Sequence, residues 1–169
     1  MNTARISAMS PMKSDDREAR KTYATLRVVG DALNPEDVTK ILLVVPTISY
    51  AKGAKYNAGK RTGELVGKTG VWAFSTDGLV ASNHLLHHLG CILGILIPSR
   101  QDALPFVQLH AFLAKNKGLR AELRCFWHGS SGARKPSIPK NVSEILKFIP
   151  ATIDTDFGTD AEKAGRKIA

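Results

Sequence analysis

The stretch Leu119-Arg-Ala-Glu-Leu-Arg-Cys-Phe-Trp-His128 decides the fold. Its apolar side chains alternate with mostly charged ones, and a period of two is typical of a β-strand with one buried face and one open face. Strands of a parallel sheet that is covered on both faces read as continuously apolar instead. The stretch therefore predicts an α+β fold with a mainly antiparallel sheet, and it places Cys125 on the buried face.

Further helices and strands are predicted on both sides of this strand. Asn34 and Pro35 supply an N-cap and a first helical residue, so a helix is expected to begin there. The chain predicts the order β-α-β-α-α-β-α-β, which corresponds to a single α+β domain with a four-stranded, mainly antiparallel sheet and helices packed on one face. The expected strands span 23–29, 71–75, 119–128 and 151–157, and the expected helices span 35–44, 82–97, 102–116 and 139–148.

Length and composition indicate one domain and a cytoplasmic protein. A chain of 169 residues can hold its own hydrophobic core, which we expect at 23–157, between a disordered leader at 1–22 and a disordered tail at 158–169. No secretory signal is predicted, because the charged N-terminal segment contains no apolar run. The apolar stretch 85–98 is too short and too interrupted to cross a membrane. The two cysteines fit a reducing compartment.

The net charge of +9 is locally dense in only one segment. Residues 50–70 combine five cations with a single acid, Glu64, and with five glycines, which predicts a mobile basic loop. Lys and Arg in such a loop can hold phosphates or other anions. A solvated loop without a ligand is the plainer interpretation and is favoured. The five cations are Lys52, Lys55, Lys60, Arg61 and Lys68.

The helix expected over 82–97 carries histidines opposite its apolar side. At 100° per residue, its leucines and isoleucines form one apolar arc that is predicted to face the core. His84, His88 and Cys91 fall together on the other side, at a spacing that suits zinc ligands. No second ligand pair or carboxylate accompanies them. A solvated polar face is therefore favoured, and no bound metal is predicted.

Three other patterns resemble parts of catalytic sites, and each is incomplete. Residues 54–60 have the spacing of a phosphate-binding loop, but Arg61 stands where that loop needs Ser or Thr for Mg²⁺. Cys125 is in the buried register of its strand, where a thiol is inert. Asp154 and Asp156 share one strand face, as an acid/base pair would, but cross-strand ion pairs with arginines are the favoured interpretation. Neither a catalytic residue nor a cofactor is predicted.

The second face of the sheet is the remaining candidate site. With Leu26 and Val28 directed inward, the outward side chains mix arginines, aromatic residues and carboxylates, a combination common on surfaces that bind partners. A solvated face crossed by ion pairs is the plainer alternative. The expected outward residues are Tyr23, Thr25, Arg27, Arg120, Glu122, Arg124, Phe126, Thr152, Asp154 and Asp156.

Several short motifs follow the pattern of a known bacterial family over about 23–157. They consist of a strand, a Gly-Asp pair, a Pro-Glu helix start, a Lys-Gly loop and a strand with Trp, namely Leu26-Arg27-Val28, Gly30-Asp31, Leu33, Pro35-Glu36, Val38-Thr39, Pro46-Thr47, Lys52-Gly53, Trp72 and Cys125-Phe126. On these residues the chain resembles the bacterial domain-of-unknown-function family 4279. The resemblance implies a small cytoplasmic domain, considered alongside immunity and interaction proteins, with no established activity.

These observations favour a non-catalytic binding module over an enzyme. The expected partner is a protein or a small anionic ligand, and membrane binding is not expected. The outward sheet face and the basic loop are expected to hold the partner through Arg27, Lys52, Gly53, Lys55, Lys60, Arg61, Trp72, Arg120 and Arg124. A nucleic-acid-binding domain that stacks bases on Tyr23 and Phe126 is the second hypothesis, although the strand signature of RNA-recognition sheets is missing. An immunity-type protein that neutralises a bacterial toxin is the third. Its positive charge argues against a nuclease as the toxin, because a basic nuclease surface needs an acidic partner.

Overall fold

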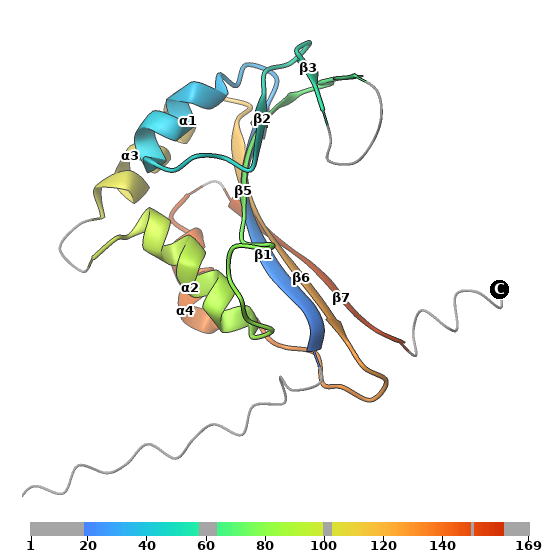
Figure 1. Ribbon diagram of the computed structural model, residues 1–169. Helices are drawn as coiled ribbons and strands as arrows, with labels where there is room; N and C mark the ends of the chain where they lie inside the picture. The colour runs from blue at the N-terminus through green and yellow to red at the C-terminus, as the bar shows by residue number, and fades with distance from the viewer. Residues whose placement is uncertain (1–18, 58–63, 100–102, 150, 161–169) are drawn as a thin grey trace, which may run out of the picture.

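Two layers make up the described part of the chain, residues 19–57, 64–99, 103–149 and 151–160. In the computed structural model, a five-stranded sheet forms one layer, and the four helices of this part form the other (Figure 1). All four helices lie on the same side of the sheet, as predicted. The α+β class is confirmed. The other side of the sheet carries no described helix.

The main sheet is mixed and has the strand order β2-β5-β1-β6-β7. Neighbouring strands are antiparallel except β6 and β7, which run parallel. The prediction of four strands was therefore wrong, whereas the mainly antiparallel character is confirmed. The strands are β1 (Ala19–Gly30), β2 (Ile48–Tyr50), β5 (Gly70–Ser75), β6 (Arg120–Gly129) and β7 (Ala151–Thr159).

Two local features explain the correction. β2 is only three residues long, so its alternation is too short to distinguish it from a loop. The parallel pair has a different cause, because α4 (Lys140–Leu146) connects β6 to the neighbouring β7. A crossover helix returns the chain to the end of the sheet where the first strand began, so the second strand runs parallel to it. Side-chain alternation reports which face is buried and carries no information on strand direction.

The remaining helices begin close to the predicted positions. α1 (Pro35–Leu42) has the predicted N-cap, since the Asn34 side chain accepts a hydrogen bond from the Glu36 backbone N–H at 3.4 Å. α1 ends at Leu43, which adopts a left-handed conformation. α2 spans Leu85–Leu96, and α3 spans Leu104–Lys115. No helix within the described ranges is long and apolar enough to cross a membrane.

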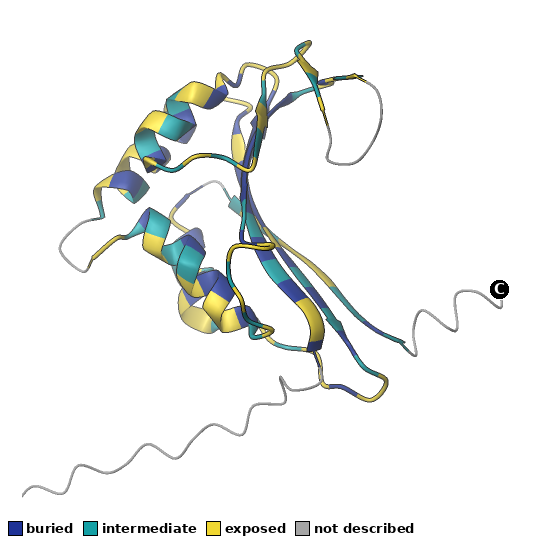
Figure 2. Cartoon of the chain, viewed as in Figure 1, coloured by how far each residue is buried: buried dark blue, intermediate teal, exposed yellow. Residues whose placement is uncertain are grey.

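The core fills the space between the helices and the inner face of the sheet (Figure 2). Trp72 on β5 is fully buried. Leu123 and Cys125 on β6 are each 1% exposed, as the alternation over 119–128 predicts. The helices contribute apolar side chains such as Leu89 and Ile92 of α2. Burial of these side chains is the main favourable term that holds the two layers together.

The buried face of α2 differs from the predicted one. His88, expected in the solvated polar face, is 1% exposed, whereas Leu86, expected in the apolar arc, is 50% exposed. The helix is so rich in Leu and Ile that several rotations bury a similar apolar area. The rotation observed is possible because both ring nitrogens of His88 have hydrogen-bond partners, which removes most of the cost of burying them.

The predicted basic loop contains a small hairpin of β3 (Lys55–Tyr56) and β4 (Leu65–Val66). The hairpin lies near β2 on the side of the sheet away from the helices (Figure 1). The Tyr56 ring stacks on Tyr50 of β2 with the ring centroids 3.8 Å apart, which attaches the hairpin to the sheet. Part of the segment expected to be a mobile loop is therefore ordered by aromatic packing.

Candidate functional site

The side of the sheet away from the helices, here called the open face, contains the side chains that the sequence placed outward. Strand pairing sets them in rows across the sheet. Every outward residue predicted from the sequence lies in one of these rows, in the predicted strand. The rows are Tyr50–Val71–Val29–Arg120, Ile48–Ala73–Arg27–Glu122–Thr152, Ser75–Thr25–Arg124–Asp154 and Tyr23–Phe126–Asp156.

Three arginines of the open face surround one carboxylate. Arg27 Nη1 donates to Glu122 Oε2 at 2.8 Å across the β1–β6 pair. Arg124 Nη2 lies 3.3 Å from the same oxygen, and Arg120 Nη2 lies 3.1 Å from Glu122 Oε1. The side chain of Glu122 is only 10% exposed. Three positive charges therefore meet one negative charge on a partly desolvated surface.

The electrostatic balance of this cluster is visible at Arg27. Burial lowers the pKa of the Arg27 guanidinium, and the neighbouring positive charge of Arg124 lowers it further, while Glu122 raises it. The single carboxylate thus does not fully compensate for desolvation and for the nearby arginines. An anion placed beside Arg27 and Arg124 would stabilise the charged form of both.

An aromatic pair borders the cluster. Tyr23 and Phe126 face each other across β1 and β6, with ring centroids 4.8 Å apart and an angle of 11° between the planes. Each ring thus covers one face of the other, and Lys21 Nζ lies 5.1 Å from the centroid of the Tyr23 ring. Beside this pair, a depression of about 380 Å³ crosses the open face from β2 to β7, and it is lined by Tyr23, Thr25, Arg27, Ile48, Ala73, Arg124, Cys125, Phe126, Asp154 and Asp156.

Two apolar residues of this depression, Ile48 and Ala73, were not predicted from the sequence. Together with Tyr50, Val29 and Val71, they form a small apolar cluster on the open face. The sequence gives no clear signal for them, because the alternation in Ile48–Tyr50 is only three residues long. The depression therefore has an apolar side toward β2, a basic middle, and an acidic side toward β7.

Residues 20–159 match the family model described as a domain of unknown function, DUF4279. The chain belongs to this family. The match confirms the resemblance seen in the sequence motifs, and it contains the whole open face. No curated protein and no solved structure matches the chain.

The structure separates Trp72 from the other candidate ligand-binding residues of this DUF4279 domain. Trp72 lies on the inner face of β5 and is fully buried, where its Nε1–H donates to Thr39 Oγ1 at 3.0 Å. Its neighbours in the strand alternate in direction, so Ala73 reaches the open face instead. The prediction that Trp72 belongs to a binding site was therefore wrong, because Trp72 is part of the core.

Two of the loop cations, Lys52 and Lys55, are paired with acids of the protein. Lys52 pairs with Asp31 and holds the pKa of that carboxyl below its usual range. Lys55 pairs with Glu64 across the hairpin at 2.8 Å. Gly53, with φ of +79°, makes the turn between β2 and β3, and its backbone N–H donates to the Gly67 carbonyl at 2.7 Å. Lys60 and Arg61 lie outside the described residues, as does the end of the candidate phosphate-binding loop.

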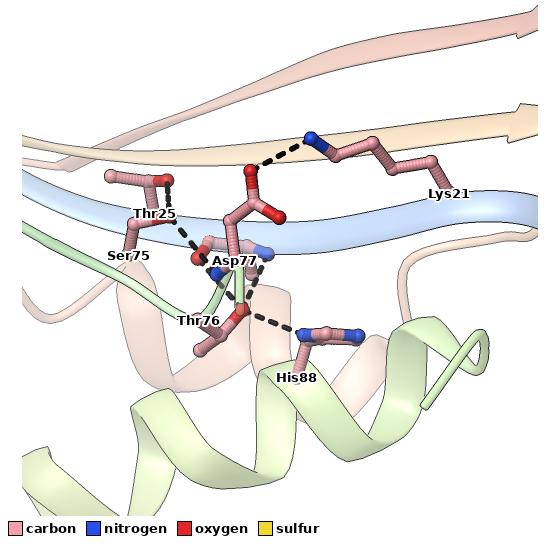
Figure 3. Close-up of polar contacts among 7 residues, drawn as sticks. Lys21, Thr25, Ser75, Thr76, Asp77 and His88 are labelled. Atoms are coloured by element: carbon pink, nitrogen blue, oxygen red, sulfur yellow. Dashed lines mark hydrogen bonds and ion pairs between the residues drawn. The ribbon is translucent and has the colours of Figure 1, made fainter. Parts of the chain in front are cut away.

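The candidate metal ligands do not share one solvated face, which corrects the predicted arrangement of His84, His88 and Cys91. His88 points into the protein, where its Nδ1 hydrogen-bonds Thr76 Oγ1 at 2.7 Å (Figure 3). Its Nε2–H donates to the Ser82 carbonyl at 2.8 Å. Both ring nitrogens are thereby occupied. Across the described ranges, no three His, Cys, Asp or Glu side chains are arranged to hold a metal ion.

Cys125, Asp154 and Asp156 are the remaining residues that the sequence suggested for catalysis. Burial raises the pKa of the Cys125 thiol to about 12, with a smaller contribution from the charge of Asp154, so the thiol stays protonated. Asp154 is exposed, and its Oδ2 lies 3.9 Å from Arg124 Nε, which is the predicted cross-strand pairing at the limit of an ion pair. Asp156 makes no ion pair with any other described residue.

Proposed function

We propose that this DUF4279 domain is a non-catalytic binding module that holds an anionic group on the open face, between Arg27 and Arg124. The ligand group is a carboxylate or a phosphate attached to an apolar body. The observation that supports the proposal is the excess of three guanidiniums over one carboxylate around Glu122. The half-exposed guanidinium of Arg124 can donate a charge-assisted hydrogen bond to an anion, which adds the missing negative charge.

The side chains around Arg27 and Arg124 favour an apolar or aromatic group next to the anionic group of the ligand. Ile48 and Ala73 line the depression on the β2 side, and the Tyr23–Phe126 pair lines the other end. An apolar or aromatic group beside the anion would cover these side chains and exclude water from the arginines, which strengthens the charge interaction. The acidic side chains Asp154 and Asp156 lie on the β7 side, so the anion belongs on the Arg27 side of the depression.

The open face fits a nucleic acid less well. The Tyr23 and Phe126 rings each cover one face of the other, and Lys21 Nζ lies over the Tyr23 ring, whereas a single-stranded nucleic acid needs free ring faces on which bases stack. Asp154 and Asp156 repel a phosphate backbone that crosses the sheet toward β7. Lys52 and Lys55 are engaged with acids of the protein. These contacts favour a compact anion over a polyanion.

The proposal is tested by titrating the ¹⁵N-labelled protein with phenyl phosphate, inorganic phosphate and anilinium. Amide shifts in β1 and β6 are expected to respond to phenyl phosphate most strongly, to phosphate weakly and to anilinium hardly at all. A short peptide that contains adjacent Phe and Glu distinguishes an acidic protein partner from a small-molecule ligand. The proposal is wrong if phenyl phosphate leaves the β1 and β6 amides unchanged.

Two variants identify the site. Arg124→Gln removes an exposed guanidinium and is expected to weaken phenyl phosphate binding by roughly tenfold, the usual value of one charge-assisted hydrogen bond. Lys40→Gln on α1, on the other side of the sheet, loses the same charge and is expected to bind normally. Micromolar binding of a single-stranded oligonucleotide at 200 mM salt, lost in Arg124→Gln, would instead support the nucleic-acid hypothesis.

A further inference from the structure

The outer edge of β7 is open along the nine residues Ala151–Thr159. β7 is the last strand in the sheet order, and no other strand of the described ranges pairs with its outer edge. Figure 1 shows its ribbon at the margin of the sheet, beside β6 and far from β2. An open strand edge presents a row of backbone donors and acceptors, which an extended chain can extend as a further strand.

β7 lacks most of the features that usually protect such an edge. The opposite edge strand, β2, is only three residues long, and Tyr56 of the hairpin packs against Tyr50 beside it. β7 is nine residues long, contains no Lys, Arg or Pro, and pairs with β6 in continuous register without a bulge. Short edges, charged side chains, prolines and bulges are the common means of preventing edge pairing. Of these, β7 has only the carboxylates of Asp154 and Asp156, which leaves it suited to addition of a strand that can pair with two acids.

A second copy of this chain is a poor occupant of the edge. Two β7 strands that pair antiparallel, with both helix layers on one side of the joined sheet, place equivalent faces together. The register that pairs all nine residues sets Asp154 opposite Asp156 of the copy. Shifting it by two residues in either direction sets Asp154 or Asp156 opposite itself. Like charges directly opposite each other destabilise a strand pair, so these registers are disfavoured.

The same two acids favour a basic partner. Asp154 is 68% exposed and has only the 3.9 Å contact with Arg124, and Asp156 has no ion-pair partner among the described residues. Both project on the open-face side of the strand, two residues apart. We propose that the β7 edge is a docking site for an extended segment of another protein that carries Lys or Arg at alternate positions, opposite Asp154 and Asp156. Pairing along this edge uses the backbone of β7 and needs no anion at Arg27, and Asp154 and Asp156 line the acidic side of the same depression.

Direct binding of defined peptides tests the inference. A fluorescent nine-residue peptide of alternating Lys and Val is titrated with the full-length protein and is expected to bind, whereas the matching Glu and Val peptide is not. In the Asp154→Lys/Asp156→Lys variant, the Lys peptide is expected to lose about tenfold in affinity, and the Glu peptide to gain, since two cross-strand charge pairs change sign. Unchanged affinity of both peptides for this variant would overturn the proposal.

Further controls separate strand addition from attraction between opposite charges. A Lys and Val peptide with alternate backbone nitrogens methylated keeps its charge but cannot pair along the edge, and it is expected to bind poorly. Asp31→Lys/Glu64→Lys makes the same change in net charge near the β2 side and is expected to leave binding unchanged. Equal binding of the methylated peptide, or equal loss in this control, would contradict strand addition.

Two measurements keep the outcome clear if the charge-reversed variant folds poorly. Hydrogen exchange of the wild-type protein is expected to slow in Ala151–Thr159 when the Lys peptide binds, and an unchanged rate there contradicts the proposal. Sedimentation of the wild-type protein is expected to show no dimer that competes with the peptide, and such a dimer would overturn the choice of a foreign partner. Phenyl phosphate binding is measured separately, so failure of the edge site is distinguishable from failure of the anion site.

Discussion

Arg27 and Glu122 lie directly opposite each other on β1 and β6, and their side chains form a 2.8 Å ion pair on the open face. The Glu122 side chain is nearly buried there, although this side of the sheet carries no described helix, because the three arginine side chains cover it. Long arginine stems can shield a carboxylate in this way while their charged heads reach water. The polar centre of the open face is therefore a built cluster rather than a set of independent surface charges.

Removal of the Glu122 charge should destabilise the fold more than removal of any one arginine at the rim. Glu122→Gln leaves three guanidiniums without a compensating charge, and we expect it to lower the free energy of unfolding by about 2 kcal/mol. Arg120→Gln, at a side chain that is 59% exposed, should cost ~0.5 kcal/mol or less. Urea denaturation of both variants measures the difference. Equal losses would show that the cluster is an ordinary solvated surface.

Thr76 should be a critical polar residue of the core. Its hydroxyl oxygen accepts a hydrogen bond from the Ala24 backbone N–H at 2.9 Å and contacts His88 Nδ1 at 2.7 Å, all in a buried setting. Thr76→Val keeps the shape but leaves both partners unsatisfied, which should cost about 1–3 kcal/mol. Thr25→Val, which loses only the partly buried contact with Ser75 on the open face, is the matched control and should cost less than Thr76→Val. Thermal unfolding that fails to separate the two variants would contradict this role.

The orientation of α2 is testable with two leucines. Leu89 is 2% exposed and Leu86 is 50% exposed, although both belong to the apolar arc predicted from the sequence. Leu89→Ala should cost about 2–5 kcal/mol, because it leaves a cavity in the core. Leu86→Ala should stay within about 0.5 kcal/mol. Chemical denaturation checks both values, and a reversed ranking would mean that α2 is rotated.

The two thiols should differ in reactivity. Because burial raises the pKa of Cys125 to about 12, roughly one thiol in 10⁴ is ionised at pH 8, and Cys91 is more exposed. Iodoacetamide at pH 8 should modify Cys91 in the native protein and Cys125 only after unfolding, as mass spectrometry of peptides shows. Rapid native labelling of Cys125 would contradict its burial.

The raised pKa of Cys125 also predicts how stability depends on pH. The folded state holds the thiol proton more tightly than the unfolded chain, whose cysteine titrates near pH 9. The contribution of the neutral thiol is therefore complete below about pH 8 and is lost as the pH rises from about 9 toward 12. The destabilisation caused by Cys125→Ala should accordingly shrink between pH 8 and pH 10.5 in urea unfolding. If the destabilisation caused by Cys125→Ala grew over this pH range, the pKa of Cys125 would be lowered rather than raised by folding.

Local sequence patterns determined which face of each long strand is buried. The alternation from Leu119 to His128 placed Cys125 in the core, and the same rule placed Arg27, Glu122 and Arg124 together on the open face, where they are found. The N-cap of α1 at Asn34 was also predicted from the sequence and is confirmed. These properties depend on a residue and its neighbours in the chain, because burial of one strand face imposes a period of two whatever the strand pairs with.

Tertiary structure decided the properties that depend on contacts between distant segments. His88 is buried because Thr76 and Ser82 complete its hydrogen bonds, and α2 itself offers no sign of that arrangement. β2 becomes a strand because β5 pairs with it, and β7 runs parallel because α4 carries the chain back along the sheet. A three-residue alternation and a strand direction leave no local signal. The five-stranded sheet, its depression and its open β7 edge depend on pairing between strands that are distant in the sequence, and these pairs form only in the folded chain.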